Sequence, residues 1–236
     1  MANDLYLDDS YLKEFESTIE SVTDNKFVVL NTTAFYPNSG GQPFDTGSLK
    51  TETDNFKVIF CGKFNGKISH EVDKPGLKVG DTVKGVIDWD RRYKLMRSHT
   101  AAHIISAVIH QNTSAMITGN QLDIDKSRID FSLEDYDPEK MQDYIDQAND
   151  IVKQNLEISV KYIPYKEALQ NPNLSKLAKG LPSNLKEIRI VSIGDFDIQA
   201  DGGTHVKSTI EVGQLTLQKT INKGKDNRRL YFTLED

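Results

Sequence analysis

Short strand-like runs of hydrophobic residues, broken by polar turns, follow one another through the first ninety residues of the chain. The clearest are Lys26–Leu30, Lys57–Phe60 and Thr82–Asp88, with turn-forming pairs such as Asn65-Gly66 between them. Frequent short strands separated by Gly and Asn turns are typical of a small β-barrel or sandwich. The run Tyr11–Ser21 fits a helix or a strand, so we predict that this part is mainly β.

The pattern changes near Trp89. A helix is predicted from Asp90, a candidate capping residue, to about Gln111, with apolar residues concentrated between Ala101 and Val108. A second helix is predicted from Asp137 to about Asn155, where a capping residue is followed by proline. Strands are expected at Arg128–Leu133, Glu157–Ile163, Ile188–Ile193, Thr209–Val212, Leu215–Asn222 and Arg229–Leu234. A short helical or irregular segment is expected at Lys166–Ala178.

The predicted fold class is therefore α+β. We expect a β-barrel-like domain with a glycine-rich motif at residues 1–88, followed by an α+β domain at residues 89–236. The glycine-rich motif lies in Tyr36–Pro43, where two prolines bracket a pair of glycines, and the backbone there can approach a ligand closely.

The composition is that of an ordinary globular protein, with 236 residues, 37% of them hydrophobic and 27% charged. The apolar runs are too short for a transmembrane helix, and the first residues lack the pattern of a signal peptide. The single cysteine, Cys61, excludes an intramolecular disulfide framework. We therefore expect a cytoplasmic protein with no membrane partner.

The formal net charge of -6 disfavours a nucleic-acid partner, because phosphate binding needs a basic surface. The positive charge is nevertheless clustered, around Arg91–Arg97 and again near the C-terminal end. Such clusters are most often solvated faces, and a local basic stripe is the alternative.

Two short motifs, about a hundred residues apart, each end in histidine. His99 and His103 are four residues apart in the predicted helix and therefore share one of its faces. Asp201-Gly202-Gly203-Thr204-His205 contains two glycines that allow a tight turn, which could aim Asp201 and His205 at the same point. Three imidazoles and one carboxylate can hold a zinc ion.

A zinc centre of this kind activates water and polarises a carbonyl, and an ester is the easiest acyl substrate for it. The residues between the two helical histidines are Thr100, Ala101 and Ala102. A metalloprotease would carry a glutamate there as its base, so the motif does not indicate a protease.

The residues Arg97–His103 and Asp201–Val206 resemble the editing domain of alanyl-tRNA synthetase, and Ala34–Gly47 looks like the glycine-rich motif of that family. The order of the motifs, with no aminoacylation domain, resembles the medium-sized free-standing editing proteins called AlaX. The resemblance extends over nearly the whole chain. It implies an enzyme that hydrolyses the ester in mischarged alanine tRNA, chiefly the serine ester and also the glycine ester.

The resemblance places the metal ligands on His99, His103, Asp201 and His205, with Zn2+ as the cofactor. The family usually has cysteine where this chain has Asp201. A carboxylate is a harder ligand than a thiolate. Asp201 could therefore ligate zinc directly, could hold a water while three histidines bind the metal, or could favour another metal.

For the substrate we expect contacts from the glycine-rich motif and from Thr33 just before it, where Thr33 is a candidate partner of a serine hydroxyl. These substrate-binding candidates are Thr33, Gly40, Gly41 and Gln42. The candidates for phosphate contacts with mischarged alanine tRNA are Arg91, Arg92, Arg97, Lys207, Lys223, Lys225, Arg228 and Arg229. Two rival functions stay open, a deacylase of another misacylated tRNA and a non-catalytic tRNA-binding module. The sequence does not indicate an oligomeric state.

Overall fold

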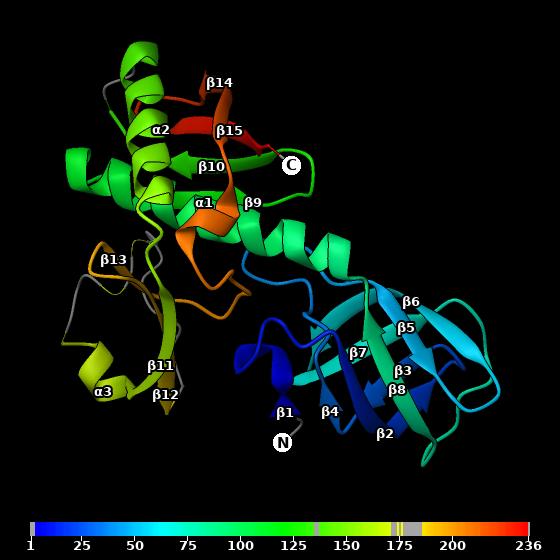
Figure 1. The fold of residues 1–236 in the computed structure, drawn as a ribbon. Coiled ribbons are helices and arrows are strands. Elements are labelled where there is room, and N and C mark those ends of the chain that lie inside the picture. The colour runs from blue at the N-terminus through cyan, green and yellow to red at the C-terminus, as the bar shows by residue number, and fades with distance from the viewer. Residues whose placement is uncertain (1–2, 135–136, 171–173, 175, 177–185, 236) are drawn as a thin grey trace. The chain divides into compact units, whose positions relative to one another are not determined.

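The computed structural model describes residues 3–134, 137–170, 174, 176 and 186–235. By internal contacts the chain divides into two compact units, Met1–Leu95 and Met96–Asp236, which we call unit 1 and unit 2. Figure 1 shows strands in both and the long helices only in the later part of the chain, so the predicted α+β class is confirmed. Among the described residues, no helix is both long enough and apolar enough to cross a membrane.

Unit 1 is built on a closed barrel with the strand order β2-β3-β7-β6-β5-β8. Its strands are β2 Glu14–Thr23, β3 Phe27–Leu30, β5 Gly47–Lys50, β6 Asn55–Phe64, β7 Lys67–Val72 and β8 Thr82–Ile87. The short strands β1 Asn3–Asp4 and β4 Thr32–Thr33 pair in parallel beside the 3-10 helix η1 Leu5–Leu7. Of the two predicted alternatives, the barrel is therefore correct.

Buried and exposed side chains alternate along β2, one of the barrel strands. Phe15, Ser17 and Ile19 are buried and their neighbours are exposed. The segment, predicted as either a helix or a strand, is therefore a strand. Phe15 lies opposite Gly85 of β8, and a side chain at Gly85 would collide with the Phe15 ring. A large side chain on β2 opposite a glycine on β8 lets the two strands approach closely.

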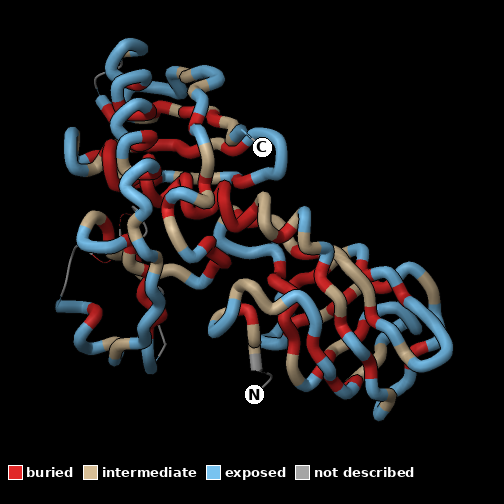
Figure 2. Tube along the Cα trace, viewed as in Figure 1, coloured by how far each residue is buried: buried red, intermediate tan, exposed pale blue. Residues whose placement is uncertain are grey.

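Unit 2 is organised around helix α1, Trp89–Thr113, which begins in unit 1. Every residue from Leu95 to Ile109 is buried, as the continuous red stretch in Figure 2 shows. A stretch of helix that is buried on all sides lies in the protein core, and its polar residues, such as Arg97 and Thr100, find hydrogen-bond partners there. The histidines of α1 are therefore held in the interior of unit 2.

Two antiparallel sheets and a second long helix complete unit 2. One sheet has the order β14-β15-β10-β9, and the other has the order β11-β12-β13. The strands are β9 Ile117–Gln121, β10 Ser127–Phe131, β11 Ile158–Pro164, β12 Glu187–Ile193, β13 Asp197–Ala200, β14 Leu215–Asn222 and β15 Arg228–Leu234. The helices are α2 Pro138–Lys153, which the Asp137 carboxylate caps as predicted, and the short α3 Tyr165–Ala168.

One predicted strand is wrong. Residues Thr209–Val212 form the 3-10 helix η3. Ser208 and Glu211 make a capping box, in which each side chain accepts a hydrogen bond from the other residue's backbone N–H, and this pairing favours a helical turn over an extended chain. Much of the segment predicted at Lys166–Ala178 lies outside the described residues.

Candidate metal centre

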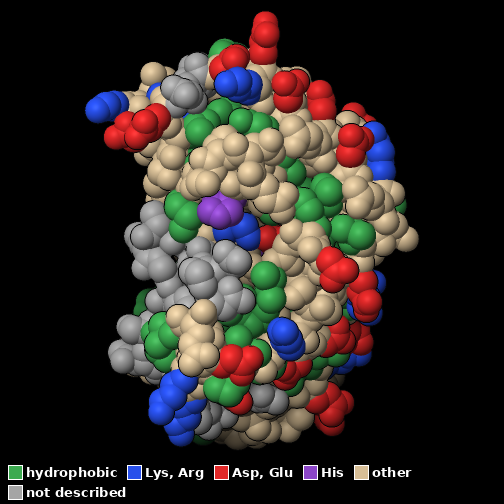
Figure 3. Space-filling view, turned by 90° about the vertical axis from the view of Figure 1, so that its left-hand side faces the viewer, with side chains coloured by type: hydrophobic (Ala, Val, Ile, Leu, Met, Phe, Trp, Pro, Cys, Tyr) green, Lys and Arg blue, Asp and Glu red, His purple; other side chains and the backbone are tan. Residues whose placement is uncertain are grey.

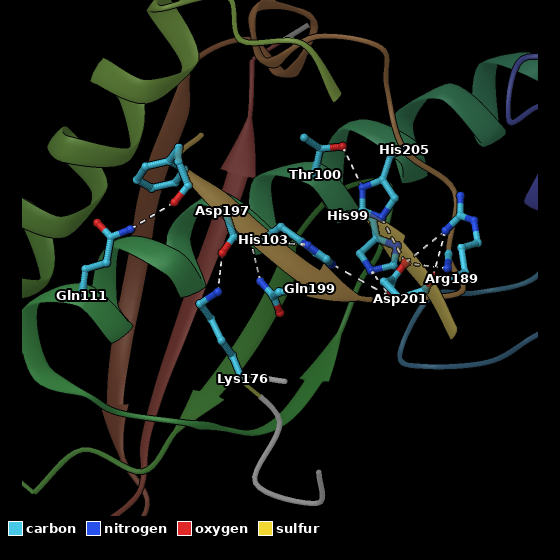
Figure 4. A network of polar contacts seen from close by, with 12 residues as sticks. His99, Thr100, His103, Gln111, Lys176, Arg189, Asp197, Gln199, Asp201 and His205 are labelled. Carbon is cyan, nitrogen blue, oxygen red and sulfur yellow. Dashed lines mark hydrogen bonds and ion pairs between the residues drawn. The ribbon is translucent and has the colours of Figure 1, made fainter. Parts of the chain in front are cut away.

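The candidate metal ligands come from two places in unit 2. His99 and His103 stand one turn apart on α1, with ring centroids 5.1 Å apart, and Asp201 and His205 flank the glycine turn after β13. Four ligand atoms, one from each of these residues, all lie within 4.8 Å of one another (Figure 4). The tertiary structure thus brings together all four residues that the two motifs predict as metal ligands.

Asp201 faces all three imidazoles. Its Oδ1 lies 3.5 Å from Nε2 of His99 and 3.9 Å from Nε2 of His103, and its Oδ2 lies 3.0 Å from Nε2 of His205. The backbone N–H of Gly203 donates to Oδ2 at 2.6 Å, so the glycine turn itself orients the carboxylate.

Burial sets the charge of the ligands. It lowers the pKa of His103 to about 4 and that of His205 well below its ordinary value, so both rings are neutral near pH 7. Burial also acts to raise the pKa of Asp201, but the nearby His99 and the hydrogen bonds from His205 and His99 outweigh it, and the pKa lies well below the usual range. Neutral imidazoles such as these two and an ionised carboxylate are the forms that bind a divalent cation, so the site is suited to a divalent metal ion.

Thr100 fixes the orientation of His205. Oγ1 of Thr100 lies 3.1 Å from Nδ1 of His205, and Nε2 of the same ring faces Asp201 at 3.0 Å. A hydrogen bond from Nδ1–H to the Thr100 hydroxyl leaves Nε2 as the nitrogen that can bind a metal. This role of Thr100 was not predicted, although its position beside His99 in the helix was a usable signal.

Arg189 of β12 was also missed, because nothing local in the sequence connects it to the motif. Its guanidinium donates to the backbone carbonyl of Asp201 at 2.9 Å, and the N–H of Asp201 donates to the carbonyl of Arg189 at 3.1 Å. These two bonds tie the start of the glycine turn to the neighbouring strand.

The predicted substrate-contacting residues belong to unit 1. Thr33 is buried, and its Oγ1 lies 2.9 Å from Nε2 of His70. Gly40 and Gly41 have φ values of 58° and 86° in a turn closed by Ser39 and Gln42, a conformation that suits glycine. Gln42 is completely buried.

The predicted phosphate-binding residues fall into two groups. The first group is buried and bonded within the protein, as Arg92 is to Asp45, Arg97 to the carbonyl of Val212, and Arg228 to the side chain of Asn222. The second group is exposed or half-buried and consists of Arg91, Lys207, Lys223, Lys225 and Arg229. A phosphate can reach only the second group without disturbing the fold.

Comparisons with known proteins agree with this architecture. The family model "tRNA synthetases class II (A)" matches residues 8–91, and "Threonyl and Alanyl tRNA synthetase second additional domain" matches residues 188–231. Alanyl-tRNA editing protein AlaX-M of Methanosarcina barkeri is 53% identical, with 100% of both chains covered. This chain belongs to the AlaX-M family of alanyl-tRNA editing proteins.

Two further relatives match this chain over nearly its whole length. An AlaX-M protein of Saccharolobus solfataricus is 43% identical over 100% of both chains. An alanine–tRNA ligase of Pyrobaculum aerophilum is 38% identical to this AlaX-M family member, but the match covers 98% of this chain and only 26% of the ligase. The resemblance predicted from the motifs is confirmed.

Proposed function

We propose that this AlaX-M family member is a trans-editing hydrolase that removes serine, and as a second substrate glycine, from mischarged alanine tRNA. Family membership and the convergence of His99, His103, Asp201 and His205 in unit 2 support the proposal. The proposed place of action is the cytoplasm. Residues 89–236 would carry the ester chemistry, and residues 1–88 the glycine-rich motif.

The four converging residues would hold Zn2+. When bound, zinc would supply a Lewis acid for the ester carbonyl and a source of hydroxide near neutral pH. The protein's own contribution is to hold the ligands still. Thr100 fixes the ring of His205, and the Gly203 N–H fixes the carboxylate of Asp201. No other side chain is proposed as a general acid or base.

Substrate choice is assigned to Thr33, Gly40, Gly41 and Gln42. Of these, Gly40 and Gly41 are accessible, whereas Thr33 and Gln42 are buried and would meet a substrate only if the turn around them opened. A site that hydrogen-bonds the serine hydroxyl leaves polar groups unpaired when alanine is bound, and it thereby protects correctly charged tRNA. Lys207, Lys223, Lys225, Arg229 and Arg91 are the proposed phosphate contacts, which would give salt-dependent affinity without reading the sequence.

The direct test is hydrolysis of serine-charged alanine tRNA, with alanine-charged tRNA as the control, before and after removal and return of Zn2+. We expect selective, zinc-restored release of serine. His99→Ala should abolish it, whereas His110→Ala, at the other end of the same helix, should not. Intact tRNA binding without turnover would instead indicate a binding module.

One rival keeps specific support. The matching family model describes threonyl as well as alanyl synthetases, so another misacylated tRNA is a second candidate substrate. Deacylation of threonine tRNA charged with serine, run beside the alanine tRNA assay, separates the two.

A further inference from the structure

A buried network of charged and polar side chains lies beside His103 and has no role in the proposed function. Asp197, the first residue of β13, pairs through Oδ1 with the ammonium of Lys176 and accepts a hydrogen bond at Oδ2 from Gln199 at 2.8 Å. Asp197, Gln199 and Asp201 follow one another at every second residue, so they share one side of the extended chain. Figure 4 shows this network next to His103.

His103 faces this network with an unsatisfied atom. Its Nε2 is turned toward Asp201, while Nδ1 is buried and has no hydrogen-bond partner among the described residues. Oδ2 of Asp197 lies 4.0 Å from Nδ1. Unpartnered buried nitrogens are rare, and a metal-ligating histidine usually donates its second N–H to a carboxylate or carbonyl.

The position of Lys176 also calls for a reason. A buried lysine–carboxylate pair gains little stability over apolar residues of similar size, because both charges lose their hydration. Lys176 and Asp197 line a cavity of about 530 Å3 together with His110 and Gln111. Lys176 binds Oδ1 of Asp197, so the other carboxylate oxygen, Oδ2, faces His103.

We propose that Asp197 is a positioning residue for the metal centre and that Lys176 holds it in place. When a metal binds at Nε2 of His103, Oδ2 of Asp197, which lies 4.0 Å from Nδ1, would come within hydrogen-bond distance and accept the Nδ1–H. That hydrogen bond fixes the tautomer and leaves Nε2 free to bind the metal. The inference rests on the proposed metal centre and adds to it two residues outside the four ligands.

The test uses Co2+ and Zn2+ with the full chain. Asp197→Asn should weaken binding of both ions about 10- to 100-fold, measured by competition with a chromophoric chelator, and should alter the visible absorption of the Co2+ form. Asp195→Asn, an exposed carboxylate in the turn before β13, is the matched control and should change neither.

Asp197→Asn leaves Lys176 buried without its partner, so the double variant Asp197→Asn/Lys176→Met separates stability from positioning. We expect it to fold like the wild type by circular dichroism and still bind metal weakly. Wild-type affinity and an unchanged Co2+ spectrum in Asp197→Asn would overturn the inference. A wild-type chain that binds neither ion would overturn the proposed metal centre itself.

A second, independent observation concerns the exposed face of the sheet β14-β15-β10-β9. Along β15, Arg228, Leu230 and Phe232 are buried while the residues between them are partly exposed. Tyr231 lies opposite Lys219 on one neighbouring strand and Arg128 on the other. The side of the sheet away from the core therefore carries a row of basic and aromatic residues.

We call Lys126, Arg128, Lys219, Arg229 and Tyr231 the basic sheet face. The ammonium groups of Lys219 and Lys126 lie 4.8 and 5.6 Å from the centre of the Tyr231 ring. Asp130 accepts hydrogen bonds from Arg229 at 2.7 and 2.8 Å and from Arg128 at 2.9 Å, so one carboxylate stands among four cations. On the face drawn in Figure 3, by contrast, acidic and basic side chains are interspersed.

We infer that the basic sheet face binds the RNA of the proposed tRNA substrate. Phosphates attract exposed lysines and arginines, and an aromatic ring on an open sheet surface is a platform on which an unpaired base stacks. Lys126 and Lys219 are the proposed phosphate contacts, and Tyr231 is the proposed stacking surface. The inference rests on tRNA as the partner.

Binding of uncharged alanine tRNA, measured by filter binding over a range of KCl concentrations, tests the inference. The double variant Lys126→Gln/Lys219→Gln should bind about tenfold more weakly, and its salt slope should fall by about two. Lys161→Gln/Lys166→Gln, two exposed lysines elsewhere in unit 2, is the control and should match the wild type. Tyr231→Ala should weaken binding, and Tyr231→Phe should not.

Unchanged affinity and salt slope in Lys126→Gln/Lys219→Gln would overturn this surface while leaving the proposed function intact. A wild-type chain that does not bind alanine tRNA at all would overturn the proposed function, and this inference with it.

Discussion

At the scale of single residues, Asp201 is the candidate ligand whose chemistry most affects which ion the candidate metal centre would prefer. It is a carboxylate at a position where the family resemblance predicts a cysteine. A thiolate is a softer ligand than a carboxylate and favours zinc. We expect Asp201→Cys to bind Zn2+ about tenfold more tightly and Asp201→Asn about tenfold more weakly than the wild type, measured by chelator competition. Equal affinity in all three would show that Asp201 is not a ligand.

His70 is a second residue whose chemistry is set by burial. Its Nδ1 donates to the carbonyl of Val28 at 2.9 Å, so Nε2 accepts the hydroxyl proton of Thr33. Burial lowers its pKa from 6.5 to about 4. Between pH 6.5 and about pH 4 the ring therefore stays neutral in the folded chain but takes up a proton in the unfolded chain. The folded state accordingly loses stability as the pH falls through this range.

We expect His70 to make the free energy of unfolding fall by up to about 3 kcal/mol between pH 6.5 and pH 4. Buried His103 and His205 also lower stability as the pH falls, so His70→Gln should make this part of the pH profile less steep, without making it flat, in urea titrations of the full chain. His110→Gln, a half-buried histidine, is the control and should leave the steep profile in place. A slope in His70→Gln as steep as in the wild type would contradict the expectation.

At the scale of elements, the first turn of α1 is anchored by Arg92. Its guanidinium pairs with the buried carboxylate of Asp45 and also donates to the backbone carbonyls of Ser10 and Ala34, at 2.9 and 2.5 Å. Removing one partner leaves the other charge buried without compensation. Arg92→Met should therefore lower the free energy of unfolding by about 3–5 kcal/mol, measured by urea denaturation.

Two further variants make this test specific. Arg92→Met/Asp45→Leu should cost less than the sum of the two single substitutions, because it removes both charges together. Arg91→Met is the neighbouring control, since Arg91 is half-buried and donates to the carbonyl of Phe44, and it should cost at most about 1 kcal/mol. A small loss in Arg92→Met would mean that water solvates Asp45.

At the scale of the whole molecule, each unit has its own core, and all four candidate ligands belong to unit 2. Metal that binds only the folded state stabilises it by mass action, by about 2.7 kcal/mol at a free concentration one hundred times Kd. We expect Zn2+ to slow hydrogen exchange in α1 and β13 and to leave the barrel strands unchanged, measured by mass spectrometry.

His205→Ala is the control for this experiment, and Zn2+ should protect none of its segments. Equal protection of the barrel strands and of β13 in the wild type would contradict the expectation that Zn2+ stabilises unit 2 alone.

The sequence by itself was enough for features that depend on neighbours a few residues apart. The helical face shared by His99 and His103, the cap at Asp137 and the glycine turn between Asp201 and His205 all follow from local spacing. The same local reasoning could have identified η3, because Ser208 and Glu211 have the spacing of a capping box. The fold class was therefore predictable, and this misassigned strand was avoidable.

Only the tertiary structure decided what depends on partners far away in the chain. A barrel and a sandwich share the same strand pattern, and they differ in the long-range pairing of β8 with β2 and β5. Arg92 and Lys223 are both cations in basic clusters, yet Arg92 is buried against Asp45 and Lys223 is exposed. Asp197 reaches His103 from a strand almost a hundred residues later. Local spacing determines the direction of a side chain within its own element, whereas burial and charge pairing depend on which distant elements pack against it.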